Sequence, residues 1–240
     1  MLKKNVKNSE ILSWDGKKCA CCLLAVGAVE IFFIFYTINN MKLRLGIVMT
    51  KNGLMEHDTR KEMEQEVAEC RVLFEKKTRD YGTSWRILRL PSLTDQIFIK
   101  ANRIRSIQES GENRVGDDIR GEFVAMVNYA VMALIQGERS KAEGESLELP
   151  LEETMTLYDE QVKRILDLMM DKNHDYGEAW RQMRVSSMVD LILMKLLRIK
   201  QIEDNEGKTL VSEGVEGGYM DIVNYSLFCL VRLTEENTIS

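Results

Sequence analysis

One stretch of this chain occurs twice. Residues 77–86 read Lys-Thr-Arg-Asp-Tyr-Gly-Thr-Ser-Trp-Arg, and residues 172–181 read Lys-Asn-His-Asp-Tyr-Gly-Glu-Ala-Trp-Arg. Between 77–107 and 172–202, fourteen of thirty-one positions are identical. A fixed period of this kind is the signature of a repeat architecture. The fold must therefore contain two copies of one unit. Because many of the shared residues are polar, we expect the copies to share more than packing.

The spacing of apolar residues indicates that each copy is helical. Met63, Val67, Cys70 and Phe74 recur at three- and four-residue steps, which places them on one face of a helix. The same periodicity continues through both copies, and we expect no strand within them. The predicted helices run over about 56–81, 92–108, 117–137, 152–176, 187–202 and 211–234.

These helices predict an all-α protein with two tandem three-helix repeats. The first repeat covers 56–138 and the second 151–240, and the polar segment 139–150 joins them as a linker. A duplicated unit can supply the twofold relation that a homodimer would otherwise provide. We therefore expect the repeats to pack as a pseudo-twofold helical bundle, and the chain could also form a homodimer.

Short signals predict where the helices end and begin. Gly82 follows Tyr81 at the end of the first helix and should be its left-handed C-terminal residue. Pro91 is expected in the next loop. The sequences Ser-x-x-Asp at 92–95 and 187–190 have the form of capping boxes that open the second helix of each repeat.

Residues 1–55 differ from the rest of the chain. Residues 19–38 are almost continuously apolar, interrupted by Glu30, and their length suits a membrane-spanning helix. Alternatively, translation begins at Met49 or Met55, and the apolar segment is not part of the protein. A buried structural segment is the third interpretation. We expect a cytoplasmic protein, or a single-pass membrane anchor if the segment is real.

Composition and charge limit the classes of function. The net charge of −5 argues against a dedicated nucleic-acid binder, and two histidines make a histidine-based zinc site unexpected. The cysteines are neither a disulfide framework nor a paired zinc motif. Positive charge nevertheless gathers in each copy, with a net of +5 over 77–105 and +3 over 172–200, so the remaining residues carry −13. Each copy could therefore meet phosphates.

Two basic pairs are the strongest candidates for phosphate binding. Lys100 with Arg103, and Lys195 with Arg198, lie three residues apart on one helical face in each copy. A lysine and an arginine so placed can hold a di- or triphosphate, the arginine through two parallel bonds. The alternative is a solvated face that forms salt bridges to the acidic third helix.

Several carboxylates are candidates for Mg²⁺, which prefers oxygen ligands and often shares them with substrate phosphates. Each of them also has a structural interpretation, as a residue of a helix end or of a salt bridge. Ala125 stands at the position of Asp221, so the second repeat is the better candidate. The third helix of that repeat also offers Glu213. The predicted metal ligands are Asp80, Asp175, Asp95, Asp190, Glu122, Glu216 and Asp221.

The shared aromatic residues are candidate substrate contacts. Tyr81 and Tyr176 could stack on or hydrogen-bond a ligand, and Trp85 and Trp180 could stack on a base. Packing of the tryptophans against the core is the alternative. The shared Val-Asn-Tyr at 127–129 and 223–225 adds an asparagine that could bind a base or tie two helices together.

The combined motif resembles a known family. Lys-x-x-Asp-Tyr-Gly-x-x-Trp, then Asp-x-x-x-x-Lys-x-x-Arg-Ile and Val-Asn-Tyr, is similar to the nucleotide modification associated domain 1 family. This is a bacterial and phage helical family, formerly known only as a domain of unknown function. The resemblance covers about 60–235 in two copies. It implies a role around modified or non-standard nucleotides. The paired Glu-x-x-Glu and Glu-x-x-Asp motifs of all-α nucleotide pyrophosphohydrolases are not cleanly present.

Two functional hypotheses follow from the sequence. The first is a nucleotide-binding protein that processes nucleotides with Mg²⁺, by a reaction resembling phosphoanhydride hydrolysis. The second is a non-catalytic helical module that binds nucleic acid or a partner protein through its basic faces. A purely structural pseudo-dimer is a third interpretation. No nucleophile triad, phosphate-binding glycine loop or dinucleotide fingerprint is evident.

Overall fold

The computed structural model describes residues 47–50, 53–56, 58–114, 116, 118–139, 146–209 and 214–239. The chain divides into two compact units, Met1–Leu45 and Gly46–Ser240, and every described residue belongs to the second. The apolar segment 19–38 and Glu213 lie outside the described residues. Within the described part, no helix is both long and apolar enough to cross a bilayer.

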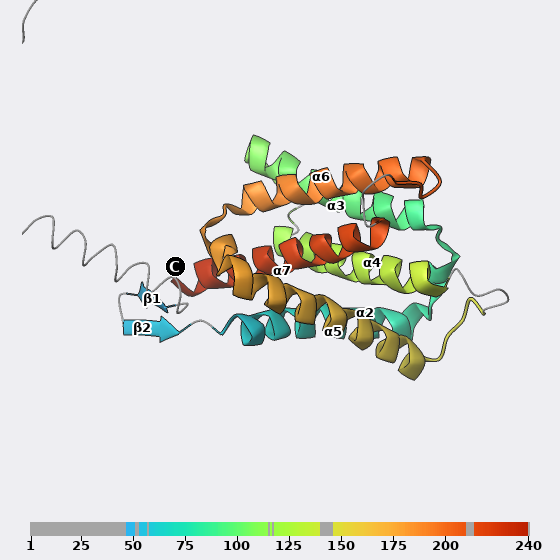
Figure 1. Ribbon diagram of the computed structural model, residues 1–240, viewed down its shortest axis with the longest axis horizontal. Coiled ribbons are helices and arrows are strands. Elements are labelled where there is room, and N and C mark those ends of the chain that lie inside the picture. The colour runs from blue at the N-terminus through green and yellow to red at the C-terminus, as the bar shows by residue number, and fades with distance from the viewer. Residues whose placement is uncertain are drawn as a thin grey trace, which may run out of the picture. The chain divides into compact units, whose positions relative to one another are not determined.

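The described residues form six α-helices, which confirms the all-α prediction (Figure 1). Each repeat has three α-helices and one short 3-10 helix in the same order. A two-stranded antiparallel hairpin, β1 (Ile47–Thr50) and β2 (Gly53–Glu56), precedes the helices in the sequence. The first repeat contains α2 (Thr59–Tyr81), η1 (Ser84–Ile87), α3 (Leu90–Ser110) and α4 (Ile119–Arg139). The second contains α5 (Leu151–Tyr176), η2 (Ala179–Gln182), α6 (Val185–Asp204) and α7 (Val215–Ile239).

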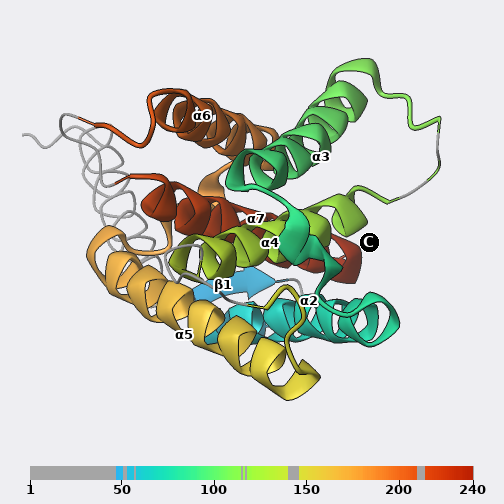
Figure 2. The ribbon, with the colours of Figure 1, turned by 90° about the vertical axis from the view of Figure 1, so that its right-hand side faces the viewer.

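The helices pack in three layers, each with one helix from either repeat (Figures 1 and 2). The third helices, α4 and α7, contact each other in the middle layer, α3 and α6 lie on one side of it, and α2 and α5 lie on the other. A helix that is apolar around most of its circumference belongs in such an interior. The buried side chains of α4 show this: only short gaps interrupt the run of buried positions from Glu122 to Ile135.

Two salt bridges confirm the predicted pseudo-twofold relation. Lys200 Nζ lies 2.6 Å from Asp95 Oδ1, and Arg105 Nη1 lies 3.6 Å from Asp190 Oδ1. In the register of the repeat, Asp95 is equivalent to Asp190 and Arg105 to Lys200. The same contact is therefore made twice, in opposite directions, between antiparallel α3 and α6. Such reciprocal contacts are what a twofold relation produces.

The predicted capping boxes are wrong. Helix α3 begins at Leu90 with Arg89 as its N-cap, and α6 begins at Val185 with Arg184 as its N-cap; neither cap forms a side-chain hydrogen bond. Pro91 therefore lies in the first turn of α3 instead of in a loop. Proline fits there because the first backbone N–H groups of a helix have no acceptor within it.

Gly82 and Gly177 end the first helix of each repeat, as predicted, but in a different conformation. Their φ angles are +61°, and their ψ angles are −149° and −171°. This is an extended region that is open almost only to glycine, and it is not the left-handed helical region that the sequence suggested. The chain turns sharply at these two glycines, and the short 3-10 helix that carries the tryptophan follows.

Candidate functional site

A cavity lies beside the doubled motif in the second repeat, and we call it the second-repeat pocket. It has a volume of about 450 Å³. Its walls come from the end of α5, the turn into η2, and one face of α7. The lining residues are Met169, Lys172, Asn173, Tyr176, Gly177, Ala179, Trp180, Met183, Asp221, Asn224, Tyr225 and Phe228.

The first repeat contains the same cavity, which we call the first-repeat pocket. Its volume is about 330 Å³. Every residue of its lining is equivalent to a residue that lines the second-repeat pocket, 95 positions later on the first two elements and 96 later on the third helix. The lining residues are Phe74, Lys77, Thr78, Tyr81, Gly82, Ser84, Trp85, Leu88, Tyr129 and Met132. The doubled motif therefore builds one site twice.

The tryptophans of the motif are walls of these pockets and parts of the core. Trp180 is buried, and its ring stacks on Phe228 with the centroids 4.5 Å apart and the planes 9° apart. Its indole Nε1 donates to Asn173 Oδ1 at 3.2 Å. Trp85 is also buried and lies 6.5 Å from Phe74. The predicted packing role is confirmed for both tryptophans.

Tyrosines are found at two depths in the pockets. Tyr81 and Tyr176 are exposed by 71% and 79%, so their rings are open to solvent. Tyr225 is half-buried, and its ring meets Phe228 edge-on with centroids 6.2 Å apart. Burial, and to a smaller extent the charge of Asp221, raise the pKa of the Tyr225 phenol. Tyr225 is therefore a hydrogen-bond donor at neutral pH.

Two lysines meet one carboxylate at the second-repeat pocket. Lys195 Nζ lies 2.5 Å from Asp221 Oδ2, and Lys172 Nζ lies 3.2 Å from Asp221 Oδ1. Asp221 and Lys172 line the cavity, and Lys195 contacts Asp221 without being part of the lining. The group has a formal charge of +1. In the first repeat Ala125 replaces Asp221, and Lys77 is exposed.

The other basic residues predicted to bind phosphate lie apart from the pocket lining. Lys100 Nζ and Arg103 Nη1 both contact Glu122, at 3.1 and 2.5 Å. Arg198 is exposed on α6. The alternative of salt bridges to the third helix is thus confirmed for three of the four residues, namely Lys100, Arg103 and Lys195.

The predicted metal ligands do not come together. Among the residues that the structure describes, no group of three His, Cys, Asp or Glu side chains could hold a metal ion. Asp95, Asp190, Glu122 and Asp221 are in the ion pairs given above. Asp80 and Asp175 are exposed at the ends of α2 and α5, and His174 Nδ1 lies 3.3 Å from Asp175 Oδ1.

Glu216 forms an ion pair whose acidic and basic partners are exchanged at the equivalent positions of the first repeat. Its carboxylate lies 3.0 Å from Arg164 Nη2. At the equivalent positions of the first repeat the charges are reversed, because Arg120 contacts Glu69. An exchange of both partners preserves the attraction between the two helices. The acidic character of Glu216 is thus explained by packing between α5 and α7.

The shared asparagines differ between the repeats. Asn128 is buried, its Nδ2 donates to the Cys70 carbonyl at 3.0 Å, and its Oδ1 accepts from the Tyr158 hydroxyl at 2.9 Å. Asn128 therefore ties α4 to α2 and α5, as the structural interpretation predicted. Asn224 is 6% exposed and lines the second-repeat pocket, and its Oδ1 has no hydrogen-bond partner among the described residues.

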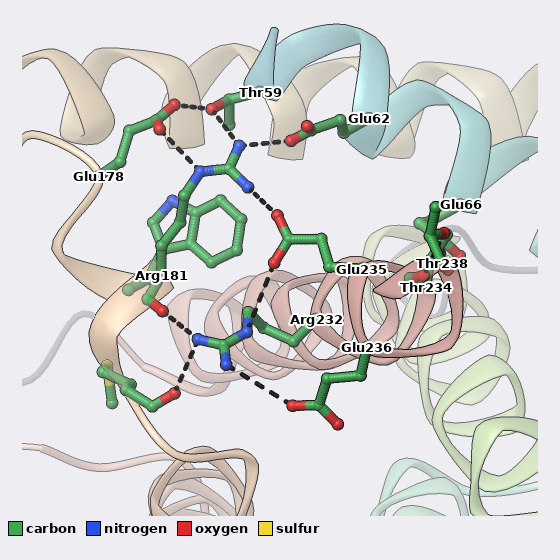
Figure 3. A network of polar contacts seen from close by, with 12 residues as sticks. Thr59, Glu62, Glu66, Glu178, Arg181, Arg232, Thr234, Glu235, Glu236 and Thr238 are labelled. Atoms are coloured by element: carbon green, nitrogen blue, oxygen red, sulfur yellow. Dashed lines mark hydrogen bonds and ion pairs between the residues drawn. The ribbon is translucent and has the colours of Figure 1, made fainter. Parts of the chain in front are cut away.

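A partly buried arginine network anchors η2, the 3-10 helix that carries Trp180 (Figure 3). Arg181 lies 2.7 Å from Glu178 and 2.6 Å from Glu235, and it also contacts Glu62 of α2. Its guanidinium lies 4.3 Å from the centre of the Trp180 ring. Burial by itself would lower the pKa of Arg181, but the bonds to Glu62 and Glu178 outweigh burial and raise it. The network fixes one wall of the second-repeat pocket.

The fold and the paired pockets define a class: an all-α protein of two tandem repeats, each with a small aromatic cavity. The chain belongs to the nucleotide modification associated domain 1 family, whose signature matches residues 77–136 and 172–233. The two matched segments are the two copies, and they include most of the pocket lining. No curated protein and no solved structure matches the chain significantly.

Sequence reasoning identified most of the motif residues but not the cavity that they share. Lys172, Asn173, Met183 and Phe228 were not considered as ligand contacts. The sequence does single out Lys172, because it is one of the fourteen positions at which the two copies are identical. Only the fold, however, brings the end of the first helix against the third helix.

Proposed function

We propose that the protein binds a nucleotide in the second-repeat pocket. The observation that carries this proposal is the duplication of one cavity from the residues that the two copies share. A ligand pocket is mostly apolar with a few placed polar groups, and its volume is typically about 300–1,000 Å³. The second-repeat pocket fits both descriptions. Membership of a family associated with nucleotide modification favours a nucleotide over other ligands of this size.

The lining offers distinct partners to the two ends of a nucleotide. Phe228 and Tyr225 are half-buried and form an aromatic wall that Trp180 backs, and a base gains about 1–3 kcal/mol by stacking on such a ring. Lys172 and Lys195 are the cations for a phosphate. Asp221 contacts both lysines, so a phosphate would compete with that carboxylate.

The proposal concerns binding and includes no reaction. Asp221 is the one predicted metal ligand that lines the pocket, and its two oxygens contact lysines. A magnesium ion would have to separate Asp221 from these lysines, or enter together with a phosphate that takes them. Titrations with and without Mg²⁺ address this point directly.

Thermal shift followed by calorimetry tests the proposal. We expect nucleoside mono-, di- or triphosphates to raise the melting temperature of the wild-type chain. Lys172→Ala should weaken binding by about tenfold or more, since a hydrogen bond to a charged group is worth about 1.5–3 kcal/mol. Two lysines serve as matched controls: Lys77→Ala changes the equivalent position of the first repeat, and Lys163→Ala changes an exposed lysine of α5.

Three results would contradict the proposal. One is a complete lack of stabilisation by any nucleotide. Another is an equal loss of affinity in Lys172→Ala and Lys163→Ala, because the pocket would then contribute nothing specific. The last is steeply salt-dependent binding of DNA together with no binding of free nucleotides, which would favour a nucleic-acid-binding module.

A further inference from the structure

The first-repeat pocket differs from the second-repeat pocket in the surroundings of its lysine. Lys77 lines the first-repeat pocket, and its ammonium group forms no ion pair or hydrogen bond with the other residues that the structure describes. The equivalent Lys172 lies 3.2 Å from Asp221. Ala125 stands at the position of Asp221 and cannot neutralise a lysine. The first-repeat pocket therefore has a cation in its lining without the carboxylate that accompanies it in the second repeat.

The position of one carboxylate on the third helix accounts for this difference. In each repeat such a carboxylate contacts the lysine of the second helix: Lys195 Nζ lies 2.5 Å from Asp221, and Lys100 Nζ lies 3.1 Å from Glu122. Asp221 belongs to the pocket lining of its repeat, whereas Glu122 does not belong to the lining of the first-repeat pocket. Lys100 is therefore engaged away from the cavity, and Lys77 is the cation of the described lining.

Aromatic residues supply the apolar part of the same cavity. Tyr129 is half-buried and Tyr81 is exposed by 71%, so both rings have surface that a ligand can reach. Tyr129 lies four residues after Ala125 on α4, and residues four apart are neighbours on one helical face. The ring of Tyr129 is thus next to the position that Asp221 has in the second repeat. A volume of about 330 Å³ suits a small ligand of one or two rings.

The carboxylate that the first repeat lacks defines the ligand chemistry. In the second repeat the protein itself places a carboxylate against the lysine of the lining, and in the first repeat a ligand can supply it. We propose that the first-repeat pocket binds a planar aromatic monocarboxylate, whose carboxylate pairs with Lys77 and whose ring packs on Tyr129. One cation in the lining matches one negative charge on the ligand. This site is separate from the second-repeat pocket, so the proposal goes beyond nucleotide binding and does not depend on it.

Calorimetry of the full chain with indole-3-carboxylate and its neutral analogue indole-3-carboxamide tests this proposal. We expect the carboxylate to bind with a dissociation constant on the order of 0.1–1 mM, as suits a ligand of about twelve heavy atoms. The carboxamide should bind about tenfold more weakly, because it brings no charge to Lys77. Lys77→Ala should weaken binding of the carboxylate by about the same factor. Lys163→Ala, which changes an exposed lysine of α5, should leave it unchanged.

Exchange of the carboxylate between the repeats gives a sharper test. Ala125→Asp gives the first repeat the residue of the second, and it should weaken binding by about tenfold because the new carboxylate competes for Lys77. Ala125→Asn adds a side chain of nearly the same size without the charge, and it should weaken binding less. In the Lys77→Ala background, Asp221→Ala should restore binding of the carboxylate, because it releases Lys172 in the second-repeat pocket.

Four results would overturn the proposal. The first is no binding of the carboxylate, and the second is binding of the carboxylate and the carboxamide within twofold of each other. The third is an equal loss in Ala125→Asp and Ala125→Asn, which would make the effect one of size. The fourth is a loss in Lys172→Ala but not in Lys77→Ala, which would place the ligand in the second-repeat pocket.

The comparison of the two ligands on the wild-type chain needs no variant, so a misfolded variant cannot hide the answer. Titrations with nucleotides are read separately at the second-repeat pocket. A failure of carboxylate binding therefore leaves nucleotide binding standing, and a failure of nucleotide binding leaves the carboxylate site standing.

Discussion

The two repeats build the same pocket and surround it with different polar groups. In the first repeat Ala125 leaves the pocket without a carboxylate, and Asn128 is bonded within the core. In the second repeat Asp221 brings two lysines to the cavity, and Asn224 keeps an unpaired carbonyl. The residues that the copies share make the cavity. The residues that differ give each cavity its own set of polar groups.

The largest expected difference between the repeats concerns the anchoring of the 3-10 helices. Arg181 is surrounded by Glu178, Glu62 and Glu235, whereas the equivalent positions around Arg86 are Thr83, Leu157 and Arg139. We expect Arg181→Ala to lower the free energy of unfolding by about 3–5 kcal/mol, because Glu62 and Glu178 lose this cation and Glu235 is left with Arg232.

Urea denaturation of Arg181→Ala measures this effect, and Arg60→Ala is a suitable control. Arg60 forms exposed pairs with Glu64 and Asp167, and its removal should lower the free energy of unfolding by less than about 1 kcal/mol. Equal losses in the two variants would show that the Arg181 network does not hold the second 3-10 helix in place.

The asparagines provide the next largest contrast. Asn128→Leu should lower the free energy of unfolding by about 2–4 kcal/mol, since the buried Tyr158 hydroxyl loses its acceptor and the Cys70 carbonyl loses its second donor. Asn224→Leu should change it by about 1 kcal/mol or less, or raise it, because the substitution removes an unpaired buried carbonyl. Thermal denaturation of both variants without ligand makes the comparison. A larger loss from Asn224→Leu would mean that Asn224 has a structural role.

Alanine substitutions at two glycines test how closely the third helices, α4 and α7, pack against their neighbours. A Cβ at Gly218 would lie 2.8 Å from the buried side chain of Ile199, whereas a Cβ at Gly121 would meet nothing within 4 Å. Gly218→Ala should therefore lower the free energy of unfolding by about 1–2 kcal/mol. Gly121→Ala should raise it by up to about 1 kcal/mol, through helix propensity. Equal effects in a denaturation experiment would contradict the close approach of α6 and α7 at Gly218.

The smallest expected effect involves a polar cluster between the two repeats that has no pseudo-twofold counterpart, because Gln108, Phe123 and Val189 stand at the equivalent positions. Glu203 Oε1 accepts from Thr94 Oγ1 at 2.8 Å, and Tyr219 joins the same cluster. Burial raises the pKa of Glu203, although these hydrogen bonds act in the opposite direction. A carboxyl with a higher pKa in the folded state binds its proton more tightly there. Stability is therefore lost as the pH rises from the unfolded pKa through the folded one.

Glu203→Gln gives the second repeat the residue of the first, Gln108. We expect it to raise the melting temperature slightly at pH 7, by about 1 °C, and to lose this advantage near pH 4, where Glu203 is protonated. The melting temperature measured across this pH range checks the sign. The difference in melting temperature between Glu203→Gln and wild type should be larger at pH 7 than at pH 4. A smaller difference at pH 7 would contradict the raised pKa of Glu203.

Most of the fold was predictable from the sequence because it depends on local patterns. Periodicity located all six described helices, and Gly82 and Gly177 located the ends of two of them. The register of the repeats predicted the twofold relation that the Asp95–Lys200 pair displays. The capping boxes failed because the 3-10 turns already lead the chain into α3 and α6, two residues before each serine.

The site was less predictable because it depends on contacts between distant segments. The sequence does not indicate that Tyr158 meets Asn128 while Met63 stands at the equivalent position opposite Asn224. It also does not indicate that Asp221 lies between Lys172 and Lys195, since three helical segments contribute to that group. Such partners follow from packing and from the drift of individual residues.

A crystal structure of the full chain with its tightest-binding nucleoside monophosphate tests the central claim most directly. We expect the base against the aromatic wall of Phe228 and Tyr225, and the phosphate within ion-pair distance of Lys172 or Lys195 in place of Asp221. A nucleotide bound instead on the exposed face of α6 near Arg198, or a second-repeat pocket that stays empty at saturating nucleotide, would contradict it.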